Sequence, residues 1–152
     1  MREIRTMNFQ TEPITMWFDR RLVLRRSPIH GVGTFTTQDI ADGELLIMVA
    51  GGMVFTTDDW KSGKIELEAT LYNQETLAPD LFIVTPVSFH YYINHSCEPN
   101  AVDVARRGNA VQYIALRDIR AQEEITADYY DATTLERCLC NAPGCRWAGA
   151  TK

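Results

Sequence analysis

The sequence predicts a mainly β domain with small helices, and three observations support this prediction. Short apolar segments separated by turn residues recur along the 152 residues, which is typical of many short strands. No segment carries a long amphipathic helical pattern. The chain has no internal repeat and no low-complexity segment. Its length suits one domain that buries roughly two-thirds of its unfolded surface.

Apolar residues mark the expected strands in the first half of the chain. Residues 17–26 mix apolar and basic side chains in alternation, and residues 45–49 form an apolar run, so both segments predict strands. A turn is expected at residues 41–44 and a bend at the glycine pair 51–52. Residues 1–15 show no clear period, which leaves a loose arm and an added edge strand both open.

The second half begins with a short predicted helix. Thr57 precedes two acidic residues and is suited to cap the helix, which Ser62 and Gly63 end early. Residues 65–71 alternate between apolar and polar side chains and favour a strand. Further strands are predicted at residues 81–84, 101–104, 110–116 and 125–127.

The charge balance limits the classes of partner. Fifteen basic and twenty acidic residues give a formal net charge of −5, which argues against direct nucleic-acid binding and suits a basic partner. No apolar run approaches the ~20 residues of a membrane span, so no membrane partner is expected. The first six residues lack the apolar core of a secretory signal. We therefore expect an intracellular protein, cytoplasmic if bacterial and nuclear if eukaryotic.

Four cysteines predict a metal site. Cys138, Cys140 and Cys145 lie close together, and a Pro-Gly turn can bring the third thiol back to the other two. Three thiolates need a fourth ligand for tetrahedral zinc, and the remaining cysteine is Cys97. Structural disulfides are not expected in a reducing cytosol. The alternative to a metal site is therefore a set of buried or redox-active thiols.

Polar residues crowd the segment Tyr-Ile-Asn-His-Ser-Cys-Glu-Pro-Asn at residues 92–100. Asn94, His95, Ser96 and Asn100 carry hydrogen-bonding side chains, and such crowding is unusual in a chain that is 45% hydrophobic. Taken alone, the segment is equally well explained as a polar turn that closes a strand.

Two other segments also have two explanations each. Gly31 and Gly33 allow the backbone to approach a ligand closely, but alone they favour a simple hairpin turn. The strand at residues 125–127 delivers Tyr129 to an edge, although core packing is the commoner role of a single tyrosine.

Together these segments resemble the SET-domain protein lysine methyltransferases. The resemblance rests on Asn-His-Ser-Cys-x-Pro-Asn at residues 94–100, Glu-Glu-Ile-Thr-x-Asp-Tyr at residues 123–129, and the Cys-x-Cys-x4-Cys tail. It covers roughly residues 18–147, and the Gly-x-Gly at residues 31–33 lies where the family carries its own.

The resemblance implies a fold and a division of the chain. The fold would be the β-clip fold of short sheets, in which the segments that hold Asn94 and Tyr129 are threaded together as a C-terminal pseudoknot. Residues 1–16 would form an N-terminal arm, residues 17–136 the SET domain, and residues 137–152 a zinc-binding tail.

The resemblance also implies the residues of the site. Tyr129 would be the catalytic residue, at the bottom of a channel where the substrate lysine meets the methyl group. The residues implied to hold S-adenosylmethionine are Gly31, Val32, Gly33, Tyr92, Asn94, His95 and Trp147. Structural zinc would be bound by Cys97, Cys138, Cys140 and Cys145.

The implied function is S-adenosylmethionine-dependent methylation of a lysine amine in a histone or another basic protein. Two alternatives stay open: a methyltransferase of the same fold that acts on a small-molecule amine, and a non-catalytic, zinc-stabilised module that binds a partner. Asn94, His95 and Tyr129 argue against the module, because a binding module has no need of all three.

Two positions depart from the family pattern. Val49 stands where a tyrosine often lines the lysine channel, unless Tyr72, Tyr91 or Tyr92 replaces it. Ala127 stands where an aromatic residue often limits the number of methyl groups added, so the methylation state stays open.

Overall fold

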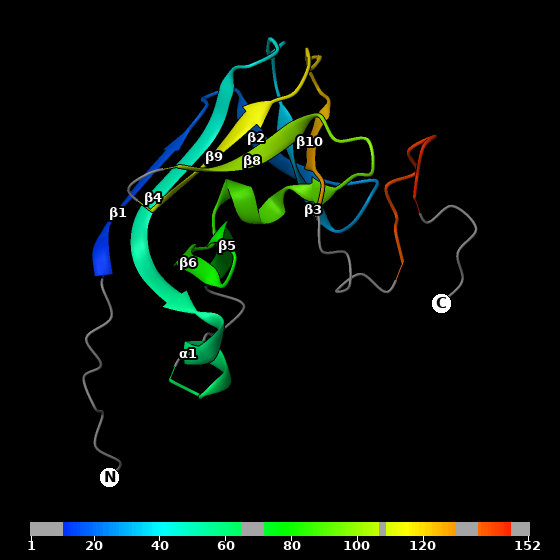
Figure 1. Ribbon diagram of the computed structural model, residues 1–152. Coiled ribbons are helices and arrows are strands. Elements are labelled where there is room, and N and C mark those ends of the chain that lie inside the picture. Colours follow the sequence, from blue (N-terminus) through cyan, green and yellow to red (C-terminus); the bar gives the residue numbers. More distant parts are fainter. Residues whose placement is uncertain (1–10, 65–71, 107–108, 130–136, 147–152) are drawn as a thin grey trace.

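The computed structural model describes residues 11–64, 72–106, 109–129 and 137–146, which form a mainly β structure as predicted (Figure 1). The strands are β1 (Thr11–Phe18), β2 (Leu22–Arg26), β3 (Val32–Thr36), β4 (Leu45–Thr56), β5 (Tyr72–Ala78), β6 (Leu81–Pro86), β7 (Asn94–His95), β8 (Ala101–Arg106), β9 (Ala110–Ala115) and β10 (Glu124–Ala127). The helices are α1 (Thr57–Lys61) and the 3-10 helix η1 (Phe89–Tyr92).

The larger sheet has six strands and is built around β4. The order is β5-β6-β4-β9-β8, and β1 also pairs with β4. Figure 1 shows β4 as the long curved strand beside β1. Strand β1 covers residues 11–18, so an added edge strand is correct for the part of the N-terminal segment that the structure describes.

The predicted single strand over residues 17–26 is wrong in one respect, because a turn divides it. β1 ends at Phe18 and β2 begins at Leu22. Between them, the Asp19 carboxylate accepts a hydrogen bond from the backbone N–H of Arg21 (2.8 Å), and the Leu22 N–H donates to the Asp19 carbonyl (3.1 Å). An aspartate that bonds the backbone two residues later is a typical turn former.

Two glycines bend β4, as predicted. Gly51 and Gly52 have φ values of +77° and +96°. A Cβ atom at Gly52 would lie 2.5 Å from the Val84 carbonyl oxygen, so a side chain there would collide with β6. The bend marks the place where β4 changes partner from β9 to β6.

Helix α1 confirms the predicted short helix but not its cap. The cap is Thr56 rather than Thr57: its hydroxyl accepts from the Asp59 N–H (3.2 Å), and the Asp59 carboxylate accepts from the Thr56 N–H (3.1 Å). This reciprocal pairing needs an acidic residue three positions after the cap. Ser62 ends the helix, as expected.

The smaller sheet brings together distant segments of the chain. Its order is β2-β3-β10-β7, so β10 lies between β3 and β7. β7 and β10 pair in parallel, with Asn94 opposite Thr126 and His95 opposite Ala127. The two segments that were expected to be threaded together therefore lie side by side.

A buried apolar cluster supports both sheets. Its fully buried members include Leu46, Ile47, Ile83, Ile119 and Ile125. Strands β3, β5 and β7 and helix η1 were not predicted, and the strand predicted at residues 65–71 lies outside the described residues. Among the described residues, no helix is long and apolar enough to cross a membrane.

Candidate active site

Tyr129 follows β10 and is held against β7. Its hydroxyl donates to the Ile93 carbonyl (2.5 Å), and its backbone N–H donates to His95 Nδ1 (3.1 Å). The rings of Tyr129 and His95 lie 5.4 Å apart. Because Tyr129 is still 37% exposed, it is not a core tyrosine. Its position is fixed while part of its side chain remains accessible.

A cavity of about 410 Å³ opens beside this tyrosine. Its volume falls within the usual range of small-molecule sites. Three predicted site residues line it, namely Asn94, His95 and Tyr129. The complete lining is Ile29, His30, Asn94, His95, Tyr129, Arg137 and Leu139. The cavity thus joins the loop after β2, the parallel pair β7–β10 and the cysteine-containing tail.

The Gly-x-Gly segment lies next to this lining rather than in it. β2 and β3 form an antiparallel hairpin, which confirms the simple turn. Gly31 has a φ of +51° in the loop, Val32 is 43% exposed, and Gly33 is buried in β3. The loop residues that line the cavity are Ile29 and His30, which the sequence did not single out.

The side chain of Asn94 ties β7 to this loop. Its amide nitrogen donates to the His30 carbonyl (3.1 Å), the Val32 carbonyl (3.3 Å) and Glu124 Oε1 (2.7 Å). Asn94 is only 9% exposed. The asparagine therefore positions the backbone of the cavity wall.

His95 joins Tyr129 to the cysteine cluster. Burial lowers the pKa of its imidazole; Asp128, 3.6 Å from Nδ1, opposes this effect, and Arg146 adds to it. The ring is consequently neutral at pH 7. Since Nδ1 accepts the Tyr129 N–H, the hydrogen-bond network assigns the proton to Nε2, which lies 3.4 Å from Cys97 Sγ.

The four cysteines converge as predicted. The Sγ atoms of Cys97, Cys138, Cys140 and Cys145 all lie within 4.8 Å of one another. Cys97 Sγ is 3.8 Å from that of Cys138 and 3.9 Å from that of Cys145. Zinc–sulfur bonds of about 2.3 Å in a tetrahedron place the sulfur atoms roughly 3.8 Å apart. The donor set therefore fits Zn²⁺.

The thiols of this cluster differ in acidity. Burial raises the pKa of Cys138 to about 12. For Cys140, burial is outweighed by hydrogen bonds from the backbone N–H groups of Cys97 and Ala142, and the pKa falls to about 7. Four thiolates this close repel one another strongly unless a cation joins them. A divalent ion held by all four sulfur atoms would remove that repulsion.

The two departures from the family pattern lie in packed parts of the structure. Val49 is 1% exposed in the apolar cluster, and Ala127 is 4% exposed in β10. Tyr92 is half-buried, with its ring edge-on to Tyr91 at 5.2 Å, and neither tyrosine lines the cavity. Trp147 lies outside the described residues.

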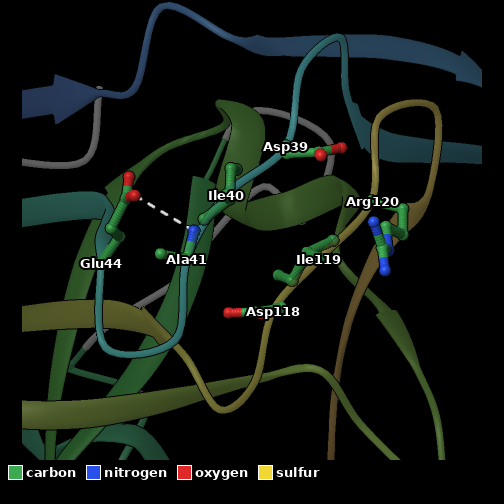
Figure 2. A pocket seen from close by; sticks show the side chains of 7 residues that line it. All are labelled: Asp39, Ile40, Ala41, Glu44, Asp118, Ile119 and Arg120. Carbon is green, nitrogen blue, oxygen red and sulfur yellow. Dashed lines mark hydrogen bonds between the residues drawn. The ribbon is translucent and has the colours of Figure 1, made fainter.

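A second cavity, of about 260 Å³, lies at the turn before β4. Figure 2 shows Asp39, Glu44 and Asp118 among the side chains that line it, with the hydrogen bond between Ala41 and Glu44 dashed. Asp39, Glu44 and Asp118 accept hydrogen bonds from backbone N–H groups at 2.8, 3.0 and 3.0 Å, respectively. These carboxylates stabilise the turns, and none of the predicted site residues lies there.

The fold and the site define a β-sheet domain with a ligand-sized cavity next to a four-cysteine cluster. A family profile described as the SET domain matches residues 31–130. Because this match covers most of the chain, the protein belongs to the SET-domain family of methyltransferases, as the resemblance implied.

Several relatives are named as histone-lysine methyltransferases. Putative histone-lysine N-methyltransferase 1 of Plasmodium falciparum is 33% identical over 138 residues, 82% of this chain and 2% of that protein. Histone-lysine N-methyltransferase 2B of Homo sapiens is 31% identical over 137 residues, 80% of this chain and 5% of that protein. The H3 lysine-4 specific histone-lysine N-methyltransferase of Saccharomyces cerevisiae is 31% identical over 138 residues, which are 82% of this chain and 13% of that protein. The chain thus spans a small fraction of each.

Proposed function

We propose that the protein transfers a methyl group from S-adenosylmethionine to a lysine side-chain amine of a protein substrate. The observation that carries this proposal is the meeting of Asn94, His95 and Tyr129 in one cavity. The parallel pairing of β7 with β10 brings these three residues together. The names of the relatives support the same reaction class.

The reaction is an in-line displacement. S-adenosylmethionine, when bound, supplies a methyl group attached to a positively charged sulfur. The lysine nitrogen forms a bond to the methyl carbon as the bond from carbon to sulfur breaks, so positive charge moves from sulfur to nitrogen. A free lysine is mostly protonated at neutral pH, and its proton leaves to water before the attack. The protein contributes chiefly alignment.

Tyr129 is the residue that we propose orients the amine. A hydroxyl oxygen has two lone pairs besides its proton, so it can accept a hydrogen bond from the amine while it donates to Ile93. The bond from the Tyr129 N–H to His95 fixes the backbone. The contribution is electrostatic pre-organisation, without a covalent intermediate.

The other proposed roles follow the cavity and the cysteine cluster. S-adenosylmethionine is proposed to contact Gly31, Val32, Gly33, Tyr92, Asn94, His95 and Trp147. Structural zinc is proposed to be bound by Cys97, Cys138, Cys140 and Cys145, whose geometry fits it. The proposed division is residues 1–16 as an N-terminal arm, 17–136 as the SET domain and 137–152 as the tail, although residues 11–16 of the arm belong to strand β1, which pairs with β4.

The proposed substrate is a basic segment of a protein, with histones as the first candidates. The net charge of −5 favours such a partner over nucleic acid. The relatives named as histone methyltransferases agree with this choice. An intracellular location, nuclear in a eukaryote, forms part of the same proposal.

The test is incubation of the zinc-loaded protein with labelled S-adenosylmethionine and a panel of histones, ribosomal proteins and cell lysate. We expect label in a protein band, and a loss of roughly 100-fold in rate for Tyr129→Phe. Trp60→Phe on α1, 55% exposed and outside the cavity lining, is the matched aromatic control. Full activity of Tyr129→Phe would contradict the proposed role of the hydroxyl.

The same experiment separates the alternatives. Label in small amines but in no protein would favour a small-molecule methyltransferase. Calorimetry of the protein with unlabelled S-adenosylmethionine measures cofactor binding directly. Absence of both transfer and binding would favour a non-catalytic module.

A further inference from the structure

The carboxylate of Glu124 bridges two parts of the cavity wall. Glu124 begins β10, between β3 and β7. Its Oε1 accepts a hydrogen bond from Asn94 Nδ2 (2.7 Å), and its Oε2 accepts one from the Ser27 hydroxyl (2.9 Å). Both carboxylate oxygens are therefore engaged, one with β7 and one with the loop after β2.

Ser27 transmits this contact to the cavity. Its hydroxyl oxygen accepts hydrogen bonds from the backbone N–H groups of Ile29 (2.9 Å) and His30 (3.2 Å) while it donates to Glu124. Ile29 and His30 both line the cavity. The loop conformation at the cavity thus depends on a serine that Glu124 holds in place.

Asn94 closes the same network from the other side. Its amide nitrogen donates to the carbonyls of His30 and Val32 as well as to Glu124. The contacts run from Glu124 through Ser27 to His30, and back through Asn94 to Glu124. Such a closed network fixes the loop relative to β7 and β10.

Gly33 is the residue that makes room for this carboxylate. A Cβ atom at position 33 would lie 2.1 Å from Glu124 Oε1 and 3.1 Å from the Ser27 Cβ. By contrast, a Cβ at Gly31 would meet nothing within 4 Å, and the φ of +51° there is what favours glycine. Glycine is therefore required at the two positions of the Gly-x-Gly segment for different physical reasons.

We propose that Glu124 is a positioning residue that fixes the loop of Ser27–Gly31 and the side chain of Asn94, and that Gly33 lacks a side chain to admit its carboxylate. The absence of a side chain at Gly33 thus serves a contact within the fold, whether or not the backbone there also meets a ligand. The expected consequence for S-adenosylmethionine binding rests on the proposed function; the consequence for loop structure does not.

Two single variants and their combination test the proposal. A flexible carboxylate can swing away from a new methyl group, but here the swing breaks the bonds to Ser27 and Asn94. Gly33→Ala should therefore reproduce the effects of Glu124→Ala, and the double variant should resemble either single one. Additive effects on stability and cofactor affinity would overturn the role given to Gly33.

Hydrogen exchange separates positioning from general stability. In Glu124→Ala, exchange of the Ile29 and His30 amides should rise by about tenfold or more, while amides of the paired strands β4 and β9 keep their protection. Equally faster exchange at the loop amides and at the amides of β4 and β9 would overturn the positioning role. This arm needs no activity, so it remains informative if the protein proves not to bind S-adenosylmethionine.

Kinetics of the holoenzyme complete the test. Glu124→Ala should raise the KM for S-adenosylmethionine by about tenfold, with less change in the KM for the protein substrate, because the loop and Asn94 face the cofactor cavity. Glu124→Gln keeps one acceptor oxygen and should recover part of this loss. Equal effects on both KM values, without recovery in Glu124→Gln, would contradict the proposal.

Discussion

The two sheets fill their interiors with different chemistry. In the six-stranded sheet nearly all the fully buried side chains are apolar, as at Leu46, Ile47 and Ile83, and the exception is Thr85 in β6. Around the four-stranded sheet many buried side chains are polar: Thr34, Thr36, Asn94, His95, Ser96, Asn100 and Thr126. Within the described residues, every fully buried side-chain nitrogen or oxygen has a hydrogen-bond partner.

The difference teaches where this fold tolerates change. Apolar contacts survive replacement by side chains of similar volume. Removal of one partner in a buried polar network leaves the other partner buried without a hydrogen bond. The resulting loss of stability is larger than the net contribution of the bond itself. The candidate site is built on the second kind of interior, so its geometry is specified more strictly than that of the larger sheet.

The largest expected effect comes from removing the metal. Structural zinc typically binds with about 10 kcal/mol or more. Chelation should therefore speed amide exchange in residues 137–146, where the Cys145 N–H bonds to the Ala142 carbonyl, and leave β4 and β9 protected. Cys140→Ser is the matched variant. A zinc content well under one per chain in reduced protein would rule out the four-cysteine site.

The next effect is expected at Asn100, which crosses the polar interior. Its amide nitrogen donates to Glu123 Oε1 (3.0 Å) and the Glu124 carbonyl (2.8 Å), and its oxygen accepts the Thr126 N–H (2.9 Å). We expect Asn100→Ala to lower the free energy of unfolding by about 4 kcal/mol, since buried partners lose their bonds. Denaturant titration measures this change; a loss under 1 kcal/mol would contradict it.

His90, buried in helix η1, gives the stability a pH dependence. It lies 3.1 Å from Thr85 Oγ1 and 2.6 Å from Ser88 Oγ, and burial lowers the pKa of its imidazole to about 4. The unfolded state, with a pKa near 6.5, binds the proton more readily. The stabilisation is thus complete above pH 6.5 and is lost as the pH falls toward 4.

Protonation of His90 should lower the free energy of unfolding by roughly 3 kcal/mol as the pH falls to 4. Unfolding of wild type and His90→Gln, measured between pH 7 and pH 4, isolates this contribution from that of the other titrating groups. Parallel pH curves for the two proteins would show that His90 does not titrate in this range.

The smallest effect is expected in the apolar interior. Ile47→Val removes one methylene from a fully buried side chain and should cost about 1 kcal/mol. Cofactor affinity should not change, because Ile47 does not line the cavity. A loss of several kcal/mol in thermal unfolding would erase the contrast between the two sheets.

The sequence predicted those strands whose apolar residues face the core. Leu45–Val49 and Ile125–Ala127 were found because their side chains alternate or run continuously, as burial in a sheet requires. Strand β5 has the polar sequence Tyr-Asn-Gln-Glu-Thr-Leu-Ala and pairs with β6 alone, so no such pattern marks it. An edge strand of this kind can be recognised only from its pairing in the structure.

The candidate site was predictable where spacing within one motif was enough. The Cys138–Cys145 spacing indicated a metal cluster, and Asn94, His95 and Tyr129 were found through their motifs. The contacts of Glu124 with Ser27 and Gly33 could not be predicted, since they depend on the placement of β10 beside β3. Arg137 and Leu139 line the cavity without any signal in the sequence.

The cavity is complete only when pairings between distant parts of the chain have formed, among them the parallel pair β7–β10. Asn94 and its partner Glu124 are 30 positions apart, whereas the hairpins β2–β3, β5–β6 and β8–β9 close locally. Non-local pairings form slowly because chain entropy is lost before contacts compensate. We therefore expect a ligand that recognises only the finished cavity to stabilise the folded protein without hastening its formation.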